Sequence, residues 1–169
     1  RGLKRDVWEG GHHVPFIIKW PDKINANSIS SEVISQVDIM ATLAGIAGIV
    51  MPEEAAPDSY DFTSVIKGEE YESPLREATI HNTYNSIWGI RKGDWLYIND
   101  STGGHRVAPD SFKRLTGYED FETDGLLFNM AKDSEQRFNL FEEYPEKIVE
   151  MDSLLQQYRN KSSSVKYSK

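Results

Sequence analysis

The chain has 169 residues, enough for one domain with a sizeable core or for one small domain and part of another. Its formal net charge of −8 argues against a general nucleic-acid binder, because neutralising phosphates requires clustered Lys and Arg side chains. No apolar run reaches the roughly 18 residues that a membrane-spanning helix needs, and the absence of cysteine excludes disulfides and thiolate metal sites within this chain.

The first predicted elements follow the order of an α/β domain. Residues 14–21, VPFIIKWP, predict a short buried strand that ends at Pro21. A helix is expected from Ser30 or Ser31, because apolar residues then recur at helical spacing and Gly48 suits a helix end. These apolar residues are Val33, Val37, Met40, Leu43, Ala44 and Ala47. Strand, loop and amphipathic helix in this order are typical of α/β architecture.

A second structural unit is expected beyond an acidic, proline-containing connector, with a boundary after residue 57. Residues 78–82 predict a strand, and the segments on either side of Lys92-Gly93 predict a β-hairpin with glycine in its turn. Residues 101–125 are expected to be mostly loop, and residues 126–130 predict a further strand. This succession is typical of an antiparallel sheet.

A terminal helix closes the predicted fold. It is expected to begin near Pro145, because proline is tolerated in the first turn, and its apolar residues fall on one face. These residues are Ile148, Met151, Leu155 and Tyr158. Residues 161–169 are rich in Ser and Lys and are predicted to form a disordered tail.

Four basic side chains are the first candidates for chemistry. Lys4 precedes a Gly-Gly pair whose backbone can approach an anion closely, although a solvated surface lysine fits the same pattern. His12 and His13 are neighbours, so in an extended segment they point to opposite faces and do not readily bind one metal ion together. His81 ends a predicted strand, where functional side chains often lie. Each histidine also fits a structural, hydrogen-bonded role.

Aromatic side chains of the predicted hairpin allow two interpretations. Trp88, Trp95 and Tyr97 suit a carbohydrate-binding platform, and their alternation equally suits packing within a sheet. In the first helix, Asp38 and Thr42 share a face four residues apart, which favours a local hydrogen bond over acid–base chemistry.

Four segments in the chain resemble, in the same order, motifs of the sulfatases. Residues 4–21, KRDVWEGGHHVPFIIKWP, match a lysine, three variable residues, an aromatic residue, Glu-Gly-Gly, Val-Pro and a strand that ends in Trp-Pro. VISQVDIMATLAGIAG is similar to the family's Val-Asp helix, and IHNTYNSIWGIRKGDWLYI to its Ile-Arg-x-Gly-x-Trp hairpin. LLFNMAKDSEQRFNLFEEYPE is similar to its segment that ends in Asn-Leu. The chain therefore resembles the C-terminal portion of an arylsulfatase-like member of the alkaline phosphatase superfamily.

This resemblance implies an α/β fold of the alkaline phosphatase-like class, present here as a fragment. Residues 1–57 would be the C-terminal remnant of the large α/β sulfatase domain. Residues 58–160 would form a C-terminal α+β subdomain with a small antiparallel sheet and a terminal helix, followed by the tail. The start of the chain is then expected to be a cut inside the enzyme, and a periplasmic or secreted location is implied.

The resemblance also implies hydrolysis of aryl or carbohydrate sulfate esters by a formylglycine nucleophile with a calcium ion. Both are expected in a missing N-terminal catalytic region, because Ser73-Pro74-Leu75-Arg76 does not match the Cys/Ser-x-Pro-x-Arg modification motif. The fragment alone is expected to be inactive and to hold no metal. By position, Lys4 matches the family's catalytic lysine that contacts the sulfate. His12 and His81 match positions that bind substrate, and His13 stands where arginine is usual.

Two alternatives stay open from the sequence. One is a phosphodiesterase or phosphotransferase of the same superfamily, in which metal-held Asp and His clusters perform the chemistry. The other is a non-catalytic carbohydrate-binding module that uses Trp88 and Trp95 of the hairpin.

Overall fold

The computed structural model describes residues 1–169 except for 53, 84–85, 105–107 and 166–169. The chain divides into two compact units. The sheet unit comprises Arg1–Pro15 and Ile80–Arg159, and the helical unit comprises Phe16–Thr79 and Asn160–Lys169. These units divide the chain differently from the predicted domains 1–57 and 58–160, which refer to a longer enzyme and stay a prediction.

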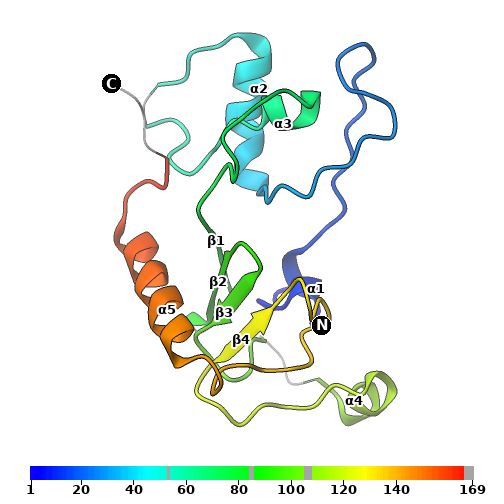
Figure 1. Ribbon diagram of the computed structural model, residues 1–169, viewed down its shortest axis with the longest axis vertical. Coiled ribbons are helices and arrows are strands. Elements are labelled where there is room, and N and C mark those ends of the chain that lie inside the picture. Colours follow the sequence, from blue (N-terminus) through cyan, green and yellow to red (C-terminus); the bar gives the residue numbers. More distant parts are fainter. Residues whose placement is uncertain (53, 84–85, 105–107, 166–169) are drawn as a thin grey trace. The chain divides into compact units, whose positions relative to one another are not determined.

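The sheet unit is built on four antiparallel strands in the order β1-β2-β3-β4 (Figure 1). The strands are β1 (Thr79–Asn82), β2 (Trp88–Lys92), β3 (Trp95–Ile98) and β4 (Leu126–Asn129). Gly93 begins the turn between β2 and β3 and has a φ of +56°, which is the left-handed conformation that glycine adopts without steric cost. The predicted hairpin and the strands on either side of it are therefore confirmed.

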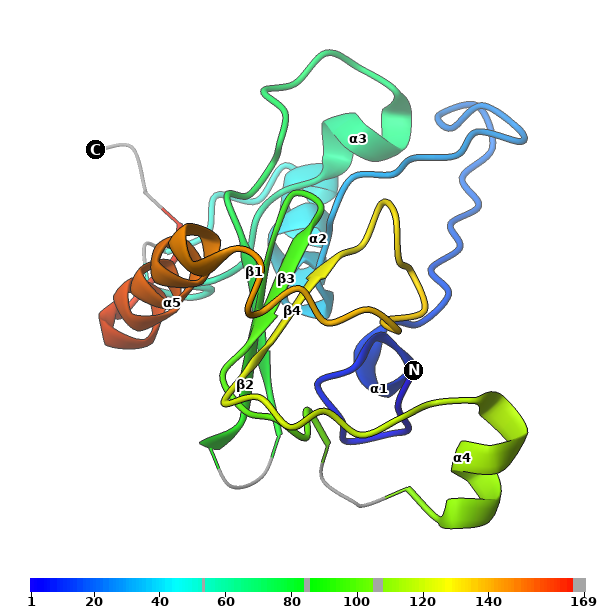
Figure 2. The ribbon, with the colours of Figure 1, turned by 60° about the horizontal axis from the view of Figure 1, so that its bottom comes forward.

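The two faces of this sheet bury different residues. Because side chains alternate along a strand, Leu96 and Ile98 point to one face, and Tyr97 points to the other. The first face packs into a buried cluster of Val7, Trp8, Ile87, Leu96, Ile98, Leu126, Phe128 and Met130. On the second face, the Tyr97 hydroxyl lies 3.3 Å from an Asp152 carboxylate oxygen of helix α5 (Pro145–Asn160). Figures 1 and 2 show α5 and α1 (Glu9–His12) on opposite sides of the sheet.

The remaining helices of the sheet unit match the sequence to different degrees. Helix α5 begins at Pro145 as predicted, and its residues Met151, Leu154 and Leu155 are buried. Helix α4 (Asp110–Thr116) lies within the segment that was predicted to be mostly loop, and none of its residues is buried.

The helical unit contains the 3₁₀ turn η1 (Gln36–Asp38) and the helices α2 (Ile39–Ala47) and α3 (Thr63–Lys67). The predicted start at Ser30 or Ser31 is wrong, because Ser35 and Asp38 form a reciprocal capping box that begins the helix there. The predicted end is confirmed, since Gly48 caps α2 in the left-handed conformation.

Asp38 joins the parts of the helical unit and is fully buried. Its carboxylate accepts hydrogen bonds from the backbone N–H groups of Ser35 at 2.6 Å and Tyr60 at 2.9 Å, and it pairs with the Arg76 guanidinium. Thr42 donates to the backbone carbonyl of Asp38 at 2.8 Å, which confirms a local hydrogen bond on this helix face. The arginine of the Ser73–Arg76 segment therefore has a structural role.

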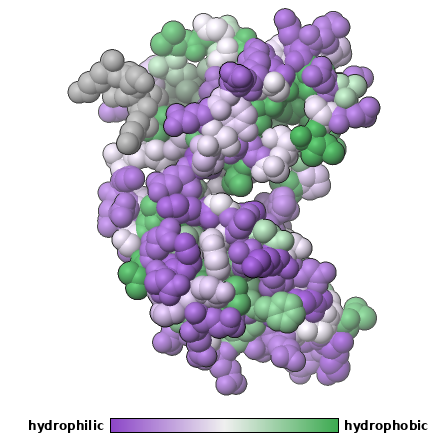
Figure 3. Space-filling view, viewed as in Figure 1, coloured by the Kyte–Doolittle hydropathy of each residue, from purple (hydrophilic) through white to green (hydrophobic). Residues whose placement is uncertain are grey.

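The buried strand predicted at residues 14–21 is wrong for this chain. No strand is assigned there, and Phe16 and Ile17 are 50% and 89% exposed. An extended segment needs a neighbouring strand for its N–H and C=O groups, and none of the described strands pairs with this segment. Helix α2 also exposes part of its predicted apolar face, since Leu43 on that face is 60% exposed. Figure 3 shows hydrophobic residues on the visible surface of the helical unit.

The end of the chain is described as far as residue 165. The backbone N–H groups of Ser164 and Val165 donate to the carbonyl of Pro57 at 3.1 and 3.2 Å, so this part of the predicted tail is bonded within the helical unit. Residues 166–169 of that tail lie outside the described residues. None of the helices in the described part of the chain is long and apolar enough to cross a membrane.

Candidate functional site

The Glu-Gly-Gly segment forms most of the single-turn helix α1, and its two glycines let neighbouring backbone approach closely. The N–H of Gly10 donates to the carbonyl of Arg1 at 2.7 Å. A Cβ atom on Gly10 would lie 2.6 Å from the Gly2 carbonyl oxygen, and one on Gly11 would lie 2.1 Å from that of Asp6. Side chains at these positions would therefore force the backbone apart. The predicted histidine, His12, is the last residue of α1.

The structure brings His12 and His81 together, although they lie far apart in the sequence. Their rings are stacked, with centroids 3.7 Å apart and an interplanar angle of 29°. His12 comes from α1 and His81 from β1. The side chain of His12 is 31% exposed, so of this pair it offers a surface that a ligand can reach.

His81 is held as a neutral ring beneath His12. Its Nε2 lies 2.9 Å from the carbonyl oxygen of Val7, which can only accept, so Nε2 carries the proton. Burial, together with the nearby His12 and Arg91, lowers the pKa of His81 to about 4. Gly89 on β2 makes this position possible, because a Cβ atom there would lie 2.6 Å from Nε2 of His81.

The carboxylate of Glu9, at the start of α1, lies close to the basic side chains of the site. Glu9 Oε2 lies 2.8 Å from His13 Nδ1, and Glu9 Oε1 lies 3.8 Å from His12 Nε2 and 3.6 Å from Arg91 Nη1. The side chain of Glu9 is only 12% exposed. Its backbone N–H donates to Oε1 of the buried Gln136 at 3.0 Å, which fixes α1 to the segment after β4. Glu9 therefore stands between three basic side chains in a fixed position.

Lys4 lies apart from these contacts. It is exposed in the turn before α1, and its side chain makes no hydrogen bond or ion pair with any described residue. Sequence reasoning therefore named His12 and His81, which meet, and Lys4, which contacts neither. It missed Glu9, Arg91 and Gln136. Glu9 and Arg91 both lie inside segments that carry the family resemblance, but only the fold shows that they meet.

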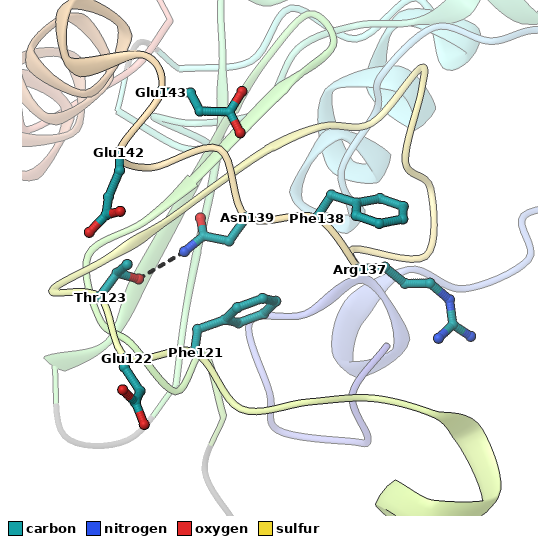
Figure 4. A pocket seen from close by; sticks show the side chains of 8 residues that line it. All are labelled: Phe121, Glu122, Thr123, Arg137, Phe138, Asn139, Glu142 and Glu143. Atoms are coloured by element: carbon teal, nitrogen blue, oxygen red, sulfur yellow. Dashed lines mark hydrogen bonds between the residues drawn. The ribbon is translucent and has the colours of Figure 1, made fainter.

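A cavity of about 380 Å³ lies elsewhere in the sheet unit (Figure 4). Its lining residues are Phe121, Glu122, Thr123, Arg137, Phe138, Asn139, Glu142 and Glu143. The Arg137 guanidinium already pairs with Glu135, bonds the carbonyl of Thr116 and stacks on Tyr118. The three glutamates leave the cavity with an acidic lining that is unsuited to a sulfate group.

The tryptophans of the hairpin are covered by cationic side chains. The Arg159 guanidinium lies 4.8 Å from the ring centroid of Trp88, and the Lys147 ammonium lies 5.7 Å from that of Trp95. Trp95 also packs against Tyr144 with centroids 5.3 Å apart. These contacts favour the interpretation in which the aromatic residues serve sheet packing.

The residues present do not fit the metal or the nucleophile that the resemblance implies. Among the described residues, no group of three or more His, Cys, Asp and Glu side chains could hold a metal ion. The sequence of this chain contains no cysteine, and its Ser-Pro-Leu-Arg segment has proline in the wrong place for the modification motif.

Comparison with known proteins gives consistent matches over nearly the whole chain. The family model of N-sulphoglucosamine sulphohydrolase, C-terminal, matches residues 3–162. An N-acetylgalactosamine-6-O-sulfatase of Bacteroides thetaiotaomicron is 30% identical over 161 residues, which are 95% of this chain and 30% of that protein. Arylsulfatase G of Mus musculus is 27% identical over 152 residues, which are 85% of this chain and 27% of that protein.

A solved structure gives the same result. The structure of a protein from a study of glycosaminoglycan metabolism by Bacteroides thetaiotaomicron superposes on this chain with a TM-score of 0.74 at 30% identity. The superposition covers 95% of this chain and 32% of that one. The chain therefore spans about a third or less of the length of the proteins that it resembles.

Proposed function

The chain belongs to the sulfatase family and corresponds to the C-terminal part of its members. We therefore propose that the longer protein containing it hydrolyses sulfate esters. The match of the C-terminal family model to residues 3–162 carries this proposal. The stacked pair of His12 and His81 beside Glu9 supports it, because these residues form a polar surface from two segments that are distant in sequence.

The substrate that we propose is a sulfated carbohydrate. The relative at 30% identity is named for the 6-O-sulfate of N-acetylgalactosamine. The relative at 27% identity is named as an arylsulfatase, so an aryl sulfate is the second choice.

The nucleophile and the metal would come from the rest of the longer protein. In this proposal a formylglycine and a calcium ion lie in an N-terminal catalytic region, since this chain offers neither the modification motif nor, among its described residues, a cluster of metal ligands. The fragment alone would then be inactive. That region would also cover the exposed apolar residues of the helical unit, including Phe16, Ile17 and Leu43.

Lys4 would act as the catalytic cation of this chain. An ammonium group about 4 Å from developing negative charge contributes on the order of a few kcal/mol at an effective dielectric constant near 20. Its exposed side chain makes no ion pair with a described residue that would neutralise it. His12 and His81 would bind the substrate, with His12 as the more accessible ring.

The proposal is tested by measuring sulfate release by the full-length protein from N-acetylgalactosamine 6-sulfate and from para-nitrophenyl sulfate. We expect Lys4→Ala to lower kcat/KM by about 10² to 10³, which is the usual cost of removing an electrostatic stabiliser. Lys132→Ala is the matched control, because Lys132 is also an exposed lysine of the sheet unit. Full turnover by Lys4→Ala would contradict the role of Lys4. If the wild-type protein released no sulfate from any of a panel of sulfated sugars and aryl sulfates, the proposed function itself would be contradicted.

A further inference from the structure

We propose that Glu9 and Arg91 are positioning residues that set the charge of His12, so that the histidine pair presents a single imidazolium, on His12, to an anionic substrate. This inference rests on the proposed function for the identity of the substrate. It adds residues to the site for which the sequence gave no role.

The stacking geometry permits only one charge in the pair. With ring centroids 3.7 Å apart, two imidazolium ions would repel each other strongly. His81 is the poorer place for a second proton, because its ring is half-buried and its Nδ1, which would take that proton, is buried without a hydrogen-bond partner among the described residues. His12 is partly exposed and has the Glu9 carboxylate 3.8 Å from its Nε2. A proton that enters the pair is therefore held on His12.

Four charged or titratable groups face His12, and they act in opposite directions. They are Glu9 on α1, His13 directly after α1, His81 on β1 and Arg91 on β2. Burial lowers the pKa of His12, the Glu9 carboxylate raises it, and His13 and Arg91 lower it. Arg91 Nη1 lies 3.6 Å from the same Glu9 oxygen that faces His12, so it weakens the effect of the carboxylate. The balance between Glu9 and Arg91 thus decides the pH at which His12 becomes charged.

The functional consequence is an affinity for anionic substrate that increases as the pH falls. An imidazolium attracts a sulfate group, whereas a neutral imidazole does not. Because the pKa of His12 lies below its ordinary value of 6.5, this increase belongs to the acidic side of the pH profile. Glu9 and Arg91 do not touch the substrate in this scheme, and their effect reaches it through His12.

The test follows the ring proton signals of the full-length protein by NMR after isotope labelling of its histidines. His12→Gln identifies the His12 signal. We expect Glu9→Gln to move the titration midpoint of His12 to lower pH, and Arg91→Gln to move it to higher pH. Arg91→Lys keeps the positive charge, so the titration midpoint of His12 in this variant should stay near that of the wild-type protein. Glu146→Gln is the matched control, because Glu146 is an exposed carboxylate in the first turn of α5.

Steady-state kinetics with N-acetylgalactosamine 6-sulfate provides the second measurement. The increase in affinity at acidic pH is measured as a fall in KM. In each variant, the pH at which KM falls should shift together with the His12 titration midpoint measured by NMR, while kcat is retained. Midpoints that do not move, or that move in the same direction in Glu9→Gln and Arg91→Gln, would overturn the inference. Opposite shifts in a protein that releases no sulfate would support the charge balance and count against the proposed function alone.

Discussion

His81 shows how one residue is specified by its surroundings. Its sequence position, at the end of a predicted strand, did not distinguish a binding role from a structural one. In the fold it is hydrogen-bonded to Val7, stacked under His12 and packed onto Gly89, and its pKa falls to about 4. His12 is the more exposed ring of the pair, so His12 can meet a ligand while His81 supports it from below.

The pKa of His81 predicts a pH dependence of stability. The folded pKa of about 4 lies below the ordinary value of 6.5, so the unfolded chain binds more protons between these two values. Stability is therefore complete above pH 6.5 and declines as the pH falls to 4, by up to about 3 kcal/mol. Urea unfolding of the full-length protein from pH 4 to 7 measures this decline. His81→Gln should flatten the profile, and an equally steep profile in that variant would disprove the assignment.

At the scale of elements, Asp38 explains why the first helix begins later than its apolar pattern predicts. The pattern extends back to Val33, but the capping box of Ser35 and Asp38 starts the helical hydrogen bonding at η1. The same carboxylate then binds Tyr60 and Arg76, so the local cap is also a tertiary contact. A local pattern of apolar residues carries no information about such a contact.

Removal of this carboxylate should be strongly destabilising. Asp38→Ala leaves the guanidinium of Arg76 buried without its counter-ion, and the backbone N–H groups of Ser35 and Tyr60 lose their acceptor. Breaking a buried ion pair in this way costs about 3–5 kcal/mol of unfolding free energy. Chemical denaturation of the full-length protein measures the loss, with the exposed Asp124→Ala as the control. Equal stability of the two variants would show that the network contributes little.

At the scale of the whole molecule, the comparisons confirm the sulfatase resemblance and the predicted fold class. The chain nevertheless spans only 30% of its 30%-identical curated relative. Its helical unit exposes large apolar side chains on helix α2 and in the segment after Pro15. Scattered exposed leucines are ordinary, but so many in one unit are typical of a surface that another part of a protein covers.

The proposed cover makes a prediction about Leu43. If the rest of the longer protein packs onto α2, Leu43→Ala in that protein should lower the unfolding free energy by about 2 kcal/mol or more, as in a core. Leu115→Ala is the control, because Leu115 is 84% exposed on α4, and its cost should stay within about 0.5 kcal/mol. Thermal or urea unfolding measures both, and a small effect at Leu43 would contradict the cover.

The sequence by itself determined the family, the hairpin around Gly93, the terminal helix from Pro145 and the segment that carries His12. These features rest on local signals, namely turn residues, apolar periodicity and a compact motif. Only the tertiary structure decided that His12 meets His81 and that Glu9 faces Arg91. The neighbouring places of β1 and β2 in the sheet and the position of α1 beside it bring these residues together, and both depend on packing between distant segments. For the same reason the apolar run at residues 14–21 did not form a strand, because a strand requires a neighbour as well as a pattern.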